Sequence, residues 1–414
     1  MEQLGPAPAT LAPPAHHPRF PLSDSIRGIA AIAVLLVHIW LFTGGFGGFT
    51  GTLPNRAMVR LDGFVAVFFL LSAFLLYRPL IAHRTGGPAA PSLGTYARGR
   101  FLRIYPAYWL ALTVLAIVPG LVGVFGDKWW VFYSMGDYFD PGFHQSICPV
   151  DEQFRCGLPQ TWTLVVEVTF YFALPFYAAL TAWLARGRQP RVWVRAELCL
   201  LALLAGLSLL FSGGPLSLHQ EAWFRFTFLG HMFWISIGLA MAVLSTVYGL
   251  RRETYPRPLR WLAARPGLCW SVGLALYAFT VFEFYPAPFA VAPFEGLEYQ
   301  ALNLIQGATA FLLMIPVLFG NPNRGAPARL LRSRFLLWIG AISYGLYLWQ
   351  VTPATDLGFG GADQGFIVVL VGTTLIALPA AALSYYFVEK PLMRLKRVPV
   401  GEWLRRLRPA SNES

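Results

Sequence analysis

Residues 23–38, SDSIRGIAAIAVLLVH, form an apolar helical stretch with one cation near its start and one imidazole inside it. His38 follows Arg27 by eleven residues, about three turns at ~100° per residue, so both side chains share one helix face. They stand ~16 Å apart along the axis. We therefore expect Arg27 at a membrane surface and His38 near the middle of the bilayer. A polar side chain at that depth is costly without a partner, which makes His38 a candidate functional residue. A packing histidine bonded to a neighbouring helix is an equally open interpretation.

The rest of the chain has the composition of a polytopic membrane protein. Of its 414 residues, 56% are hydrophobic and only 13% are charged. We therefore predict an all-α transmembrane domain over residues 22–395, a disordered tail over residues 1–21 and a basic tail over residues 396–414. Apolar runs predict about ten spanning helices, centred near residues 35, 70, 113, 173, 205, 237, 276, 310, 344 and 375.

The net charge of +12 follows this topology and gives no reason to expect nucleic-acid binding. Ten spans place both termini on one side, and that side holds nearly all Lys and Arg residues. The exceptions are Arg56, Arg60, Lys128, Arg155 and Arg225. An excess of cations in cytoplasmic loops is typical of membrane proteins, so we predict a multi-pass protein of the inner (plasma) membrane with cytoplasmic termini.

Two of the four cysteines lie close together in the longest outer loop. Cys148 and Cys156 enclose a short loop in a compartment that permits oxidation, which predicts a disulfide; two free thiols are the alternative. No spacing of residues typical of a metal site occurs in the sequence.

Other charged groups mark two further spans. Arg100 and Arg103 are three residues apart at the cytoplasmic start of one helix, a geometry that suits bidentate phosphate binding. Ordinary flanking charge is the alternative, and it is favoured when the pair is considered alone. Glu167 is the most deeply placed carboxylate of the chain, so we expect it to face the bundle interior, where it and His38 would converge.

Six segments, taken in chain order, resemble the motifs of the membrane-bound acyltransferase-3 family, whose members O-acylate cell-envelope sugars and secreted small molecules. The similarity covers nearly the whole chain. The segments are Asp24-x-x-Arg27-Gly28 with His38, Phe68 to Phe74, Arg100-Phe-Leu-Arg103, Trp162 to Glu167 with Phe170-Tyr171, Ser343 to Trp349, and Phe387-Val-Glu-Lys-Pro391. Departures from the family pattern, which bear on the acceptor, are Ala66, Ala73, Val168 and Gln350.

The resemblance implies an acyl-CoA donor, acetyl-CoA first, on the cytoplasmic side, with no metal. It implies an acceptor hydroxyl on a carbohydrate, glycolipid or glycosylated metabolite outside. His38 would then be the general base, or would carry the acyl group itself, with Glu167 orienting the imidazole or binding the acceptor. The expected donor-binding residues are Arg27, Arg100 and Arg103, and the expected substrate-binding residues are Asp24, Ser72, Trp162 and Tyr347.

Two other functions stay open at this stage. Buried His and Glu residues in a ten-span bundle suit a proton-coupled transporter of small solutes, although no inverted repeat is visible in the sequence. A non-catalytic membrane sensor with the same fold is the second alternative.

Overall fold

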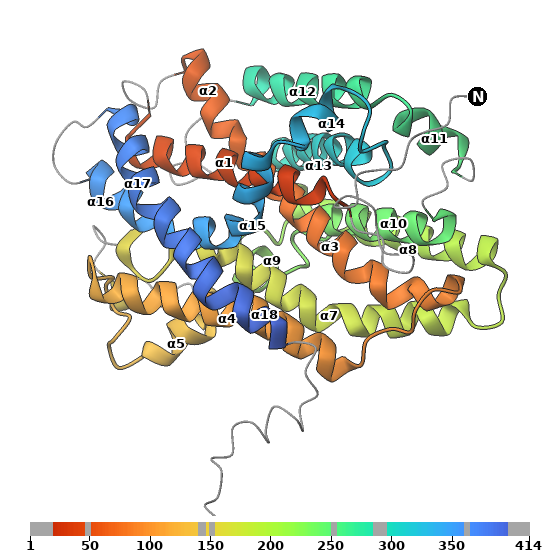
Figure 1. The fold of residues 1–414 in the computed structure, drawn as a ribbon, viewed down its shortest axis with the longest axis horizontal. Coiled ribbons are helices and arrows are strands. Elements are labelled where there is room, and N and C mark those ends of the chain that lie inside the picture. The colour runs from red at the N-terminus through yellow and green to blue at the C-terminus, as the bar shows by residue number, and fades with distance from the viewer. Residues whose placement is uncertain are drawn as a thin grey trace, which may run out of the picture.

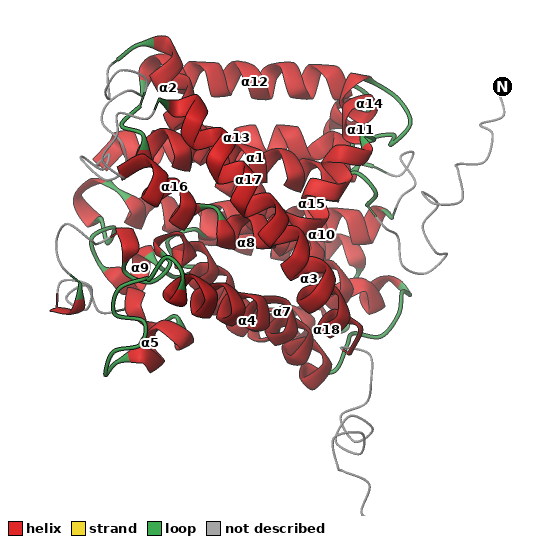
Figure 2. Ribbon diagram, turned by 60° about the vertical axis from the view of Figure 1, so that its left-hand side comes forward, coloured by secondary structure: helices red, strands yellow, loops and turns green. Residues whose placement is uncertain are grey.

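The computed structural model describes residues 20–45, 51–139, 146–148, 154–249, 255–284, 296–359 and 365–395. These residues form helices and connecting loops, with one isolated β-bridge between Val122 and Cys156 and no strand among them (Figures 1 and 2). The two predicted tails lie outside the described residues, apart from residues 20 and 21.

All ten predicted span centres fall within helices. The long helices are α1 (Ser23–Phe42), α3 (Val65–Ile81), α4 (Leu93–Ile117), α7 (Trp162–Ala185), α8 (Pro190–Ser212), α10 (Met232–Tyr248), α12 (Pro266–Glu283), α13 (Gly296–Leu318), α15 (Arg334–Trp349) and α17 (Phe366–Ser384). Within the described part, eight helical segments are long and apolar enough to cross a membrane, and α3, with 17 residues of its own, is counted as part of the segment Leu53–Thr85. α15 and the following α16 (Val351–Phe359) meet at a bend of 51° and make a ninth if counted as one span, whereas α10 has only 17 residues. The predicted multi-pass helical fold is confirmed, and by this measure the count is eight or nine.

Short helices connect these spans. They are α2 (Leu53–Val59), η1 (Arg60–Phe64), η2 (Ala82–Thr85), α5 (Trp129–Ser134), η3 (Gly136–Tyr138), η5 (Pro159–Thr161), η6 (Gly214–Leu216), α9 (Ala222–Arg225), α11 (Arg257–Ala263), α14 (Ala326–Leu331), the π-helical turn η8 (Tyr385–Glu389) and α18 (Lys390–Arg394).

α1 and α3 lie inside the bundle, and glycines let other helices approach them closely. A Cβ on Gly28 of α1 would stand 2.6 Å from the carbonyl oxygen of Leu336, and one on Gly340 of α15 would collide with the backbone of Asp24. Gly238 of α10 meets the backbone of Leu70 of α3 in the same way. The outer helices α7, α8, α12 and α17 instead expose large apolar side chains, as lipid-facing helices do.

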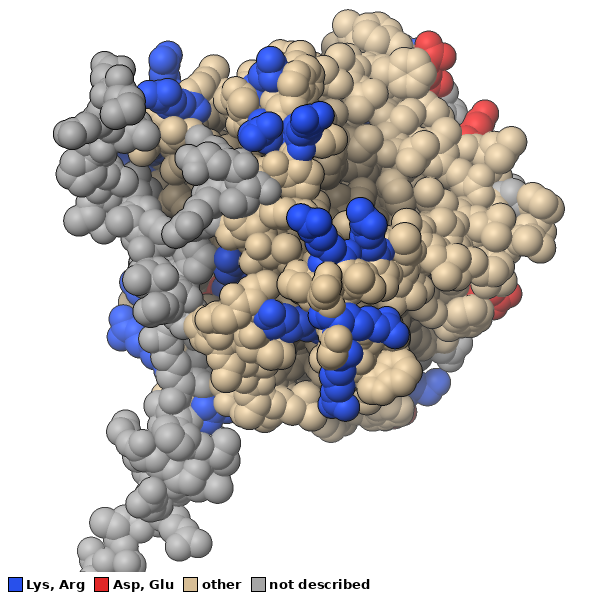
Figure 3. All heavy atoms as spheres, turned by 90° about the vertical axis from the view of Figure 1, so that its right-hand side faces the viewer, with Lys and Arg blue, Asp and Glu red and all other residues tan. Residues whose placement is uncertain are grey.

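The bundle has two chemically different ends. α1, α4 and α8 begin, and α3 and α7 end, at what we call the basic end, on the right of Figure 1. Figure 3 looks onto this end and shows Lys and Arg side chains gathered there. The opposite end, called the far end, carries the connection between α4 and α7. The structure pairs Cys148 and Cys156 in a disulfide within this connection.

Candidate functional site

Three adjoining cavities run through the bundle from the basic end towards the far end. We call them the basic cavity (about 660 Å³), the middle cavity (about 160 Å³) and the far cavity (about 390 Å³). The basic and middle cavities share Arg27, Arg100 and Arg103 as lining residues. The middle and far cavities share Val34, Val65, Thr163 and Tyr347.

The basic cavity brings together cations from three parts of the chain. Its charged lining residues are Arg27 of α1, Arg100 and Arg103 of α4, Lys390 and Arg394 of α18, and Asp24 of α1. The helical register places Arg100 and Arg103 on one side of α4, as predicted. A cavity with this excess of guanidinium and ammonium groups suits the phosphates of a nucleotide.

Each predicted arginine already has a neighbour. Arg27 forms an ion pair with Asp24 at 2.9 Å, and Arg103 forms one with the buried Glu389 at 3.3 Å. The guanidinium of Arg100 lies over the ring of Tyr171, 5.8 Å from its centroid. A bound phosphate would therefore compete with, or join, two carboxylates.

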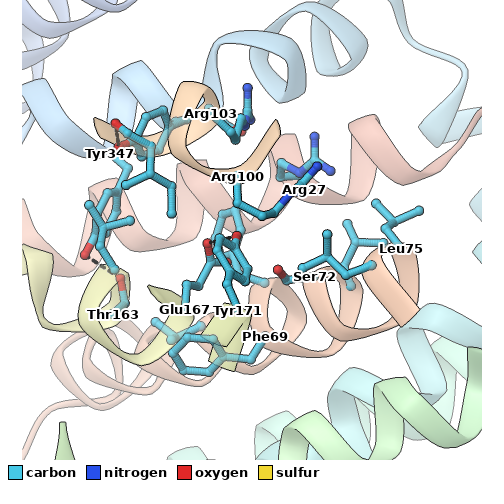
Figure 4. A pocket seen from close by; sticks show the side chains of 18 of the residues that line it. Arg27, Phe69, Ser72, Leu75, Arg100, Arg103, Thr163, Glu167, Tyr171 and Tyr347 are labelled. Atoms are coloured by element: carbon cyan, nitrogen blue, oxygen red, sulfur yellow. Dashed lines mark hydrogen bonds between the residues drawn. The ribbon is translucent and has the colours of Figure 1, made fainter. Parts of the chain in front are cut away.

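The middle cavity carries the next polar groups along the path. Tyr171 donates a hydrogen bond of 2.6 Å to Glu167 Oε2, and Ser72 of α3 lines the same wall. Figure 4 shows Glu167 and Tyr171 below Arg100, with Thr163 on one side of them and Ser72 on the other. The hydroxyl and carboxylate groups of the middle cavity can form hydrogen bonds with an extended ligand.

His38 lies beyond the middle cavity, in the wall of the far cavity. Its Nδ1 is 3.2 Å from Nε2 of Gln350, and its ring stacks on Phe42 at 6.4 Å. His38 is four residues from the last residue of α1, so it lies nearer the far end than the middle of that helix. The imidazole faces a cavity, and its hydrogen-bond partner is Gln350.

The structure does not bring Glu167 to the imidazole. Glu167 lines the middle cavity with Tyr171, while His38 lines the far cavity with Gln350. The other expected substrate-binding residues are spread along the path. Asp24 lies in the basic cavity, Ser72 in the middle cavity, Tyr347 at the junction and Trp162 in the far cavity.

The far cavity has an aromatic wall with a few polar groups. His231 lies between Trp162 and Trp234, with ring centroids 5.5 Å away in both cases. Elsewhere in this cavity, Asp62 Oδ1 accepts a 3.0 Å hydrogen bond from Gln306 Nε2. The guanidinium nitrogen Nη2 of Arg60 lies 3.8 Å from Oδ2 of the same carboxylate. Rings beside hydrogen-bond acceptors are chemically suited to a sugar, whose C–H faces stack on them.

A second polar group of the far cavity lies in the connection between α8 and α10. Burial and the charge of the nearby Arg225 lower the pKa of His219 to about 4, so this imidazole is neutral at physiological pH. Arg225, rather than this histidine, therefore supplies positive charge to that part of the far cavity.

Sequence reasoning missed several lining residues. Lys390 and Arg394 join the basic cavity, and only the Glu389-Lys390-Pro391 motif pointed to that segment. Asp62, Arg225 and His231 line the far cavity, and none of them was proposed as a site residue from the sequence. Among the described residues, no three His, Cys, Asp or Glu side chains gather as metal ligands would.

Comparison with known proteins gives one family and several relatives. The sequence model of the acyltransferase-3 family, described as an acyltransferase domain, matches residues 22–388. The putative peptidoglycan O-acetyltransferase YrhL of Bacillus subtilis is 26% identical over an alignment of 401 positions that covers 91% of this chain and 55% of that protein. Nodulation protein 10 of Rhizobium leguminosarum is 27% identical over an alignment of 400 positions that covers 90% of this chain and 93% of that protein.

A third relative is the peptidoglycan O-acetyltransferase OatA of Listeria monocytogenes, 24% identical over an alignment of 443 positions that covers 93% of this chain and 60% of that protein. The chain thus spans little more than half the length of the two O-acetyltransferases. No solved structure matches the chain.

Proposed function

Because this chain belongs to the acyltransferase-3 family, we propose that it is a membrane O-acyltransferase that moves an acetyl group from acetyl-CoA to a carbohydrate hydroxyl. The observation that carries the proposal is the row of cavities, with cations at one end and an imidazole in the cavity wall near the other. The names of the Bacillus and Listeria relatives support acetyl as the group and a cell-envelope glycan as the acceptor.

The donor binds with its phosphates in the basic cavity. Arg27, Arg100 and Arg103 contact them, and Lys390 and Arg394 add charge from α18. The ~16 Å rise from Arg27 to His38 along α1 is comparable to the reach of an extended pantetheine arm. Glu167 and Ser72 lie along the way and are suited to bind the amide and hydroxyl groups of that arm.

His38 acts as the general base in direct transfer. It takes the proton of the acceptor hydroxyl while the hydroxyl oxygen bonds to the thioester carbonyl carbon. The carbon–sulfur bond breaks, and the proton passes from the imidazole to the departing coenzyme A thiolate. For Nε2 to act as the base, the proton of the neutral imidazole must be on Nδ1. A turn of the Gln350 carboxamide lets its oxygen, which has no other hydrogen-bond partner, accept from Nδ1–H.

The orientation in the membrane follows from the charges. The basic end faces the cytoplasm, both termini lie there, and the far cavity opens outside. α10 counts as the tenth span, because 17 residues rise ~26 Å, close to the ~30 Å hydrocarbon core. We also propose that the transmembrane domain covers residues 22–395, between tails over residues 1–21 and 396–414. The proposed location is the inner membrane.

Transfer of isotope-labelled acetyl tests the function. Purified protein in lipid nanodiscs receives labelled acetyl-CoA and peptidoglycan or polysaccharide fragments, and mass spectrometry detects acetylated products and free coenzyme A. We expect product with the natural chain and none with His38→Ala, whereas His83→Ala, an exposed histidine at the basic end, is the matched control. Full activity of His38→Ala would refute the assignment of the base.

A further inference from the structure

The middle and far cavities meet at a ring of four side chains, one from each of four helices. We call this ring the neck: Val34 of α1, Val65 of α3, Thr163 of α7 and Tyr347 of α15. Thr163 Oγ1 and Tyr347 Oη are 2.6 Å apart, and Tyr347 also donates to the carbonyl oxygen of Gln160. Hydrogen bonds therefore fix one half of the neck, and two valines form the other half.

Charged and ionisable side chains of α1 and α7 lie on both sides of the neck. Along α1, Val34 follows Arg27 by seven residues and precedes His38 by four, so all three share one face. The corresponding rises are ~10 Å and ~6 Å. Along α7, Glu167 follows Thr163 by one turn on the basic side. The neck thus lies between the imidazole on one side and the cations and Glu167 on the other.

We propose that the neck is the passage for the pantetheine arm of the donor, and that it retains the nucleotide on the basic side. This inference rests on the proposed function. Two valines offer no partner to a phosphate, so burial of the nucleotide's charges at that point would be costly. A slender chain of methylene and amide groups is uncharged, so it does not carry the cost of burying a charge. The neck therefore lets only the arm and its acyl group reach His38, while coenzyme A stays where it entered.

A disulfide-exchange experiment tests the passage without knowledge of the acceptor. Cys199 and Cys269, the free cysteines of the described chain, are replaced by Ser, and His38→Cys introduces one thiol beyond the neck. The probe is the mixed disulfide of coenzyme A and 2-thiopyridine. The thiolate at position 38 attacks the coenzyme A sulfur, forms a protein–coenzyme A disulfide and releases pyridine-2-thione. Intact-protein mass spectrometry measures the adduct.

We expect the adduct in the His38→Cys protein and its loss when excess coenzyme A competes. Adding Val34→Trp, or Val65→Phe from the opposite wall, should lower the labelling rate about tenfold or more, because the arm no longer passes. Val34→Ala should keep the labelling. Val371→Trp is the matched control, since Val371 of α17 is exposed on the outside of the bundle.

Two accompanying measurements separate the possible failures. 2,2′-Dithiodipyridine, which lacks the nucleotide, should label position 38 in every variant through the far cavity, and this shows that the thiol stays reactive in each of them. Equilibrium binding of coenzyme A should persist in Val34→Trp. Unchanged labelling by the coenzyme A probe in both neck variants would show that the arm does not pass through the neck. Binding of coenzyme A without any labelling at position 38 would also contradict this passage while leaving the donor site intact. Absence of both binding and labelling would overturn the proposed donor site itself.

Discussion

At the scale of single residues, the carboxamide of Gln350 decides how the imidazole of His38 is presented. Gln350 is buried and lies 3.2 Å from Nδ1 of His38, so it fixes one ring nitrogen and leaves Nε2 without that contact. Gln350→Leu keeps most of the volume and removes the contact. We expect kcat for acetyl transfer to fall about tenfold with unchanged acetyl-CoA affinity.

Conservative replacement supplies the control for Gln350. Gln350→Glu offers a carboxylate oxygen that accepts from Nδ1–H, and it should recover most of the rate lost in Gln350→Leu. Equal kcat values for Gln350→Leu and the natural chain would show that the contact does not position the imidazole.

The two arginines of α4 should respond differently to truncation. Arg100 has no carboxylate partner among the described ion pairs, so Arg100→Ala should weaken acetyl-CoA binding about tenfold and leave thermal stability unchanged. Arg103→Ala should weaken binding and also lower the melting temperature, because it leaves the buried Glu389 unpaired. Equilibrium binding and thermal unfolding check both.

The control for this pair is a cation outside the cavities. Arg188 is exposed at the basic end and lines none of the three cavities, so Arg188→Ala should change neither quantity. An equal loss of affinity in Arg188→Ala and Arg100→Ala would mean that general surface charge, and not the basic cavity, attracts the donor.

At the scale of elements, the crossing of α1 and α15 holds the path in register. Gly28 and Gly340 let the two backbones touch, and these helices carry Arg27, Val34, His38 and Tyr347. Gly340→Leu would push the helices apart, at a cost of about 3 kcal/mol if the fold survives. We therefore expect a lower melting temperature and loss of acetyl transfer.

A glycine with free space around it provides the comparison. Apart from its chain neighbours and the backbone of its own helix, no atom would lie within 4 Å of a Cβ on Gly206 in α8. Gly206→Leu should therefore leave activity unchanged and even favour the helix. Equal stability of Gly340→Leu and Gly206→Leu would contradict the close crossing.

At the scale of the whole molecule, the charge distribution predicts which end faces the cytoplasm. Arg188 and Trp129 are exposed at the basic and far ends. In a background without Cys199 and Cys269, Arg188→Cys should react with a membrane-impermeant maleimide only in inverted vesicles, and Trp129→Cys only in intact spheroplasts. The reverse pattern would invert the proposed orientation.

The sequence predicted the relative positions of two residues wherever both lie on one helix. Arg27 and His38, or Arg100 and Arg103, share a face because helical periodicity fixes their relation. Depth and lateral position between helices have no such local rule. Glu167 and His38 were expected to meet, yet they lie one turn to either side of the neck. Likewise, η8 and α18 bring Lys390 and Arg394 to arginines almost 300 residues earlier, which no local pattern indicates.

The central claim is that an acyl group enters from a donor at the basic end and reaches an acceptor at the far end through His38. Sealed inverted membrane vesicles from cells that produce the chain contain their own acceptors inside. Radiolabelled acetyl-CoA added outside should acetylate the enclosed glycans with the natural chain and not with His38→Ala. Equal labelling with His38→Ala, or equal labelling in right-side-out vesicles that expose only the far end to the donor, would contradict the account.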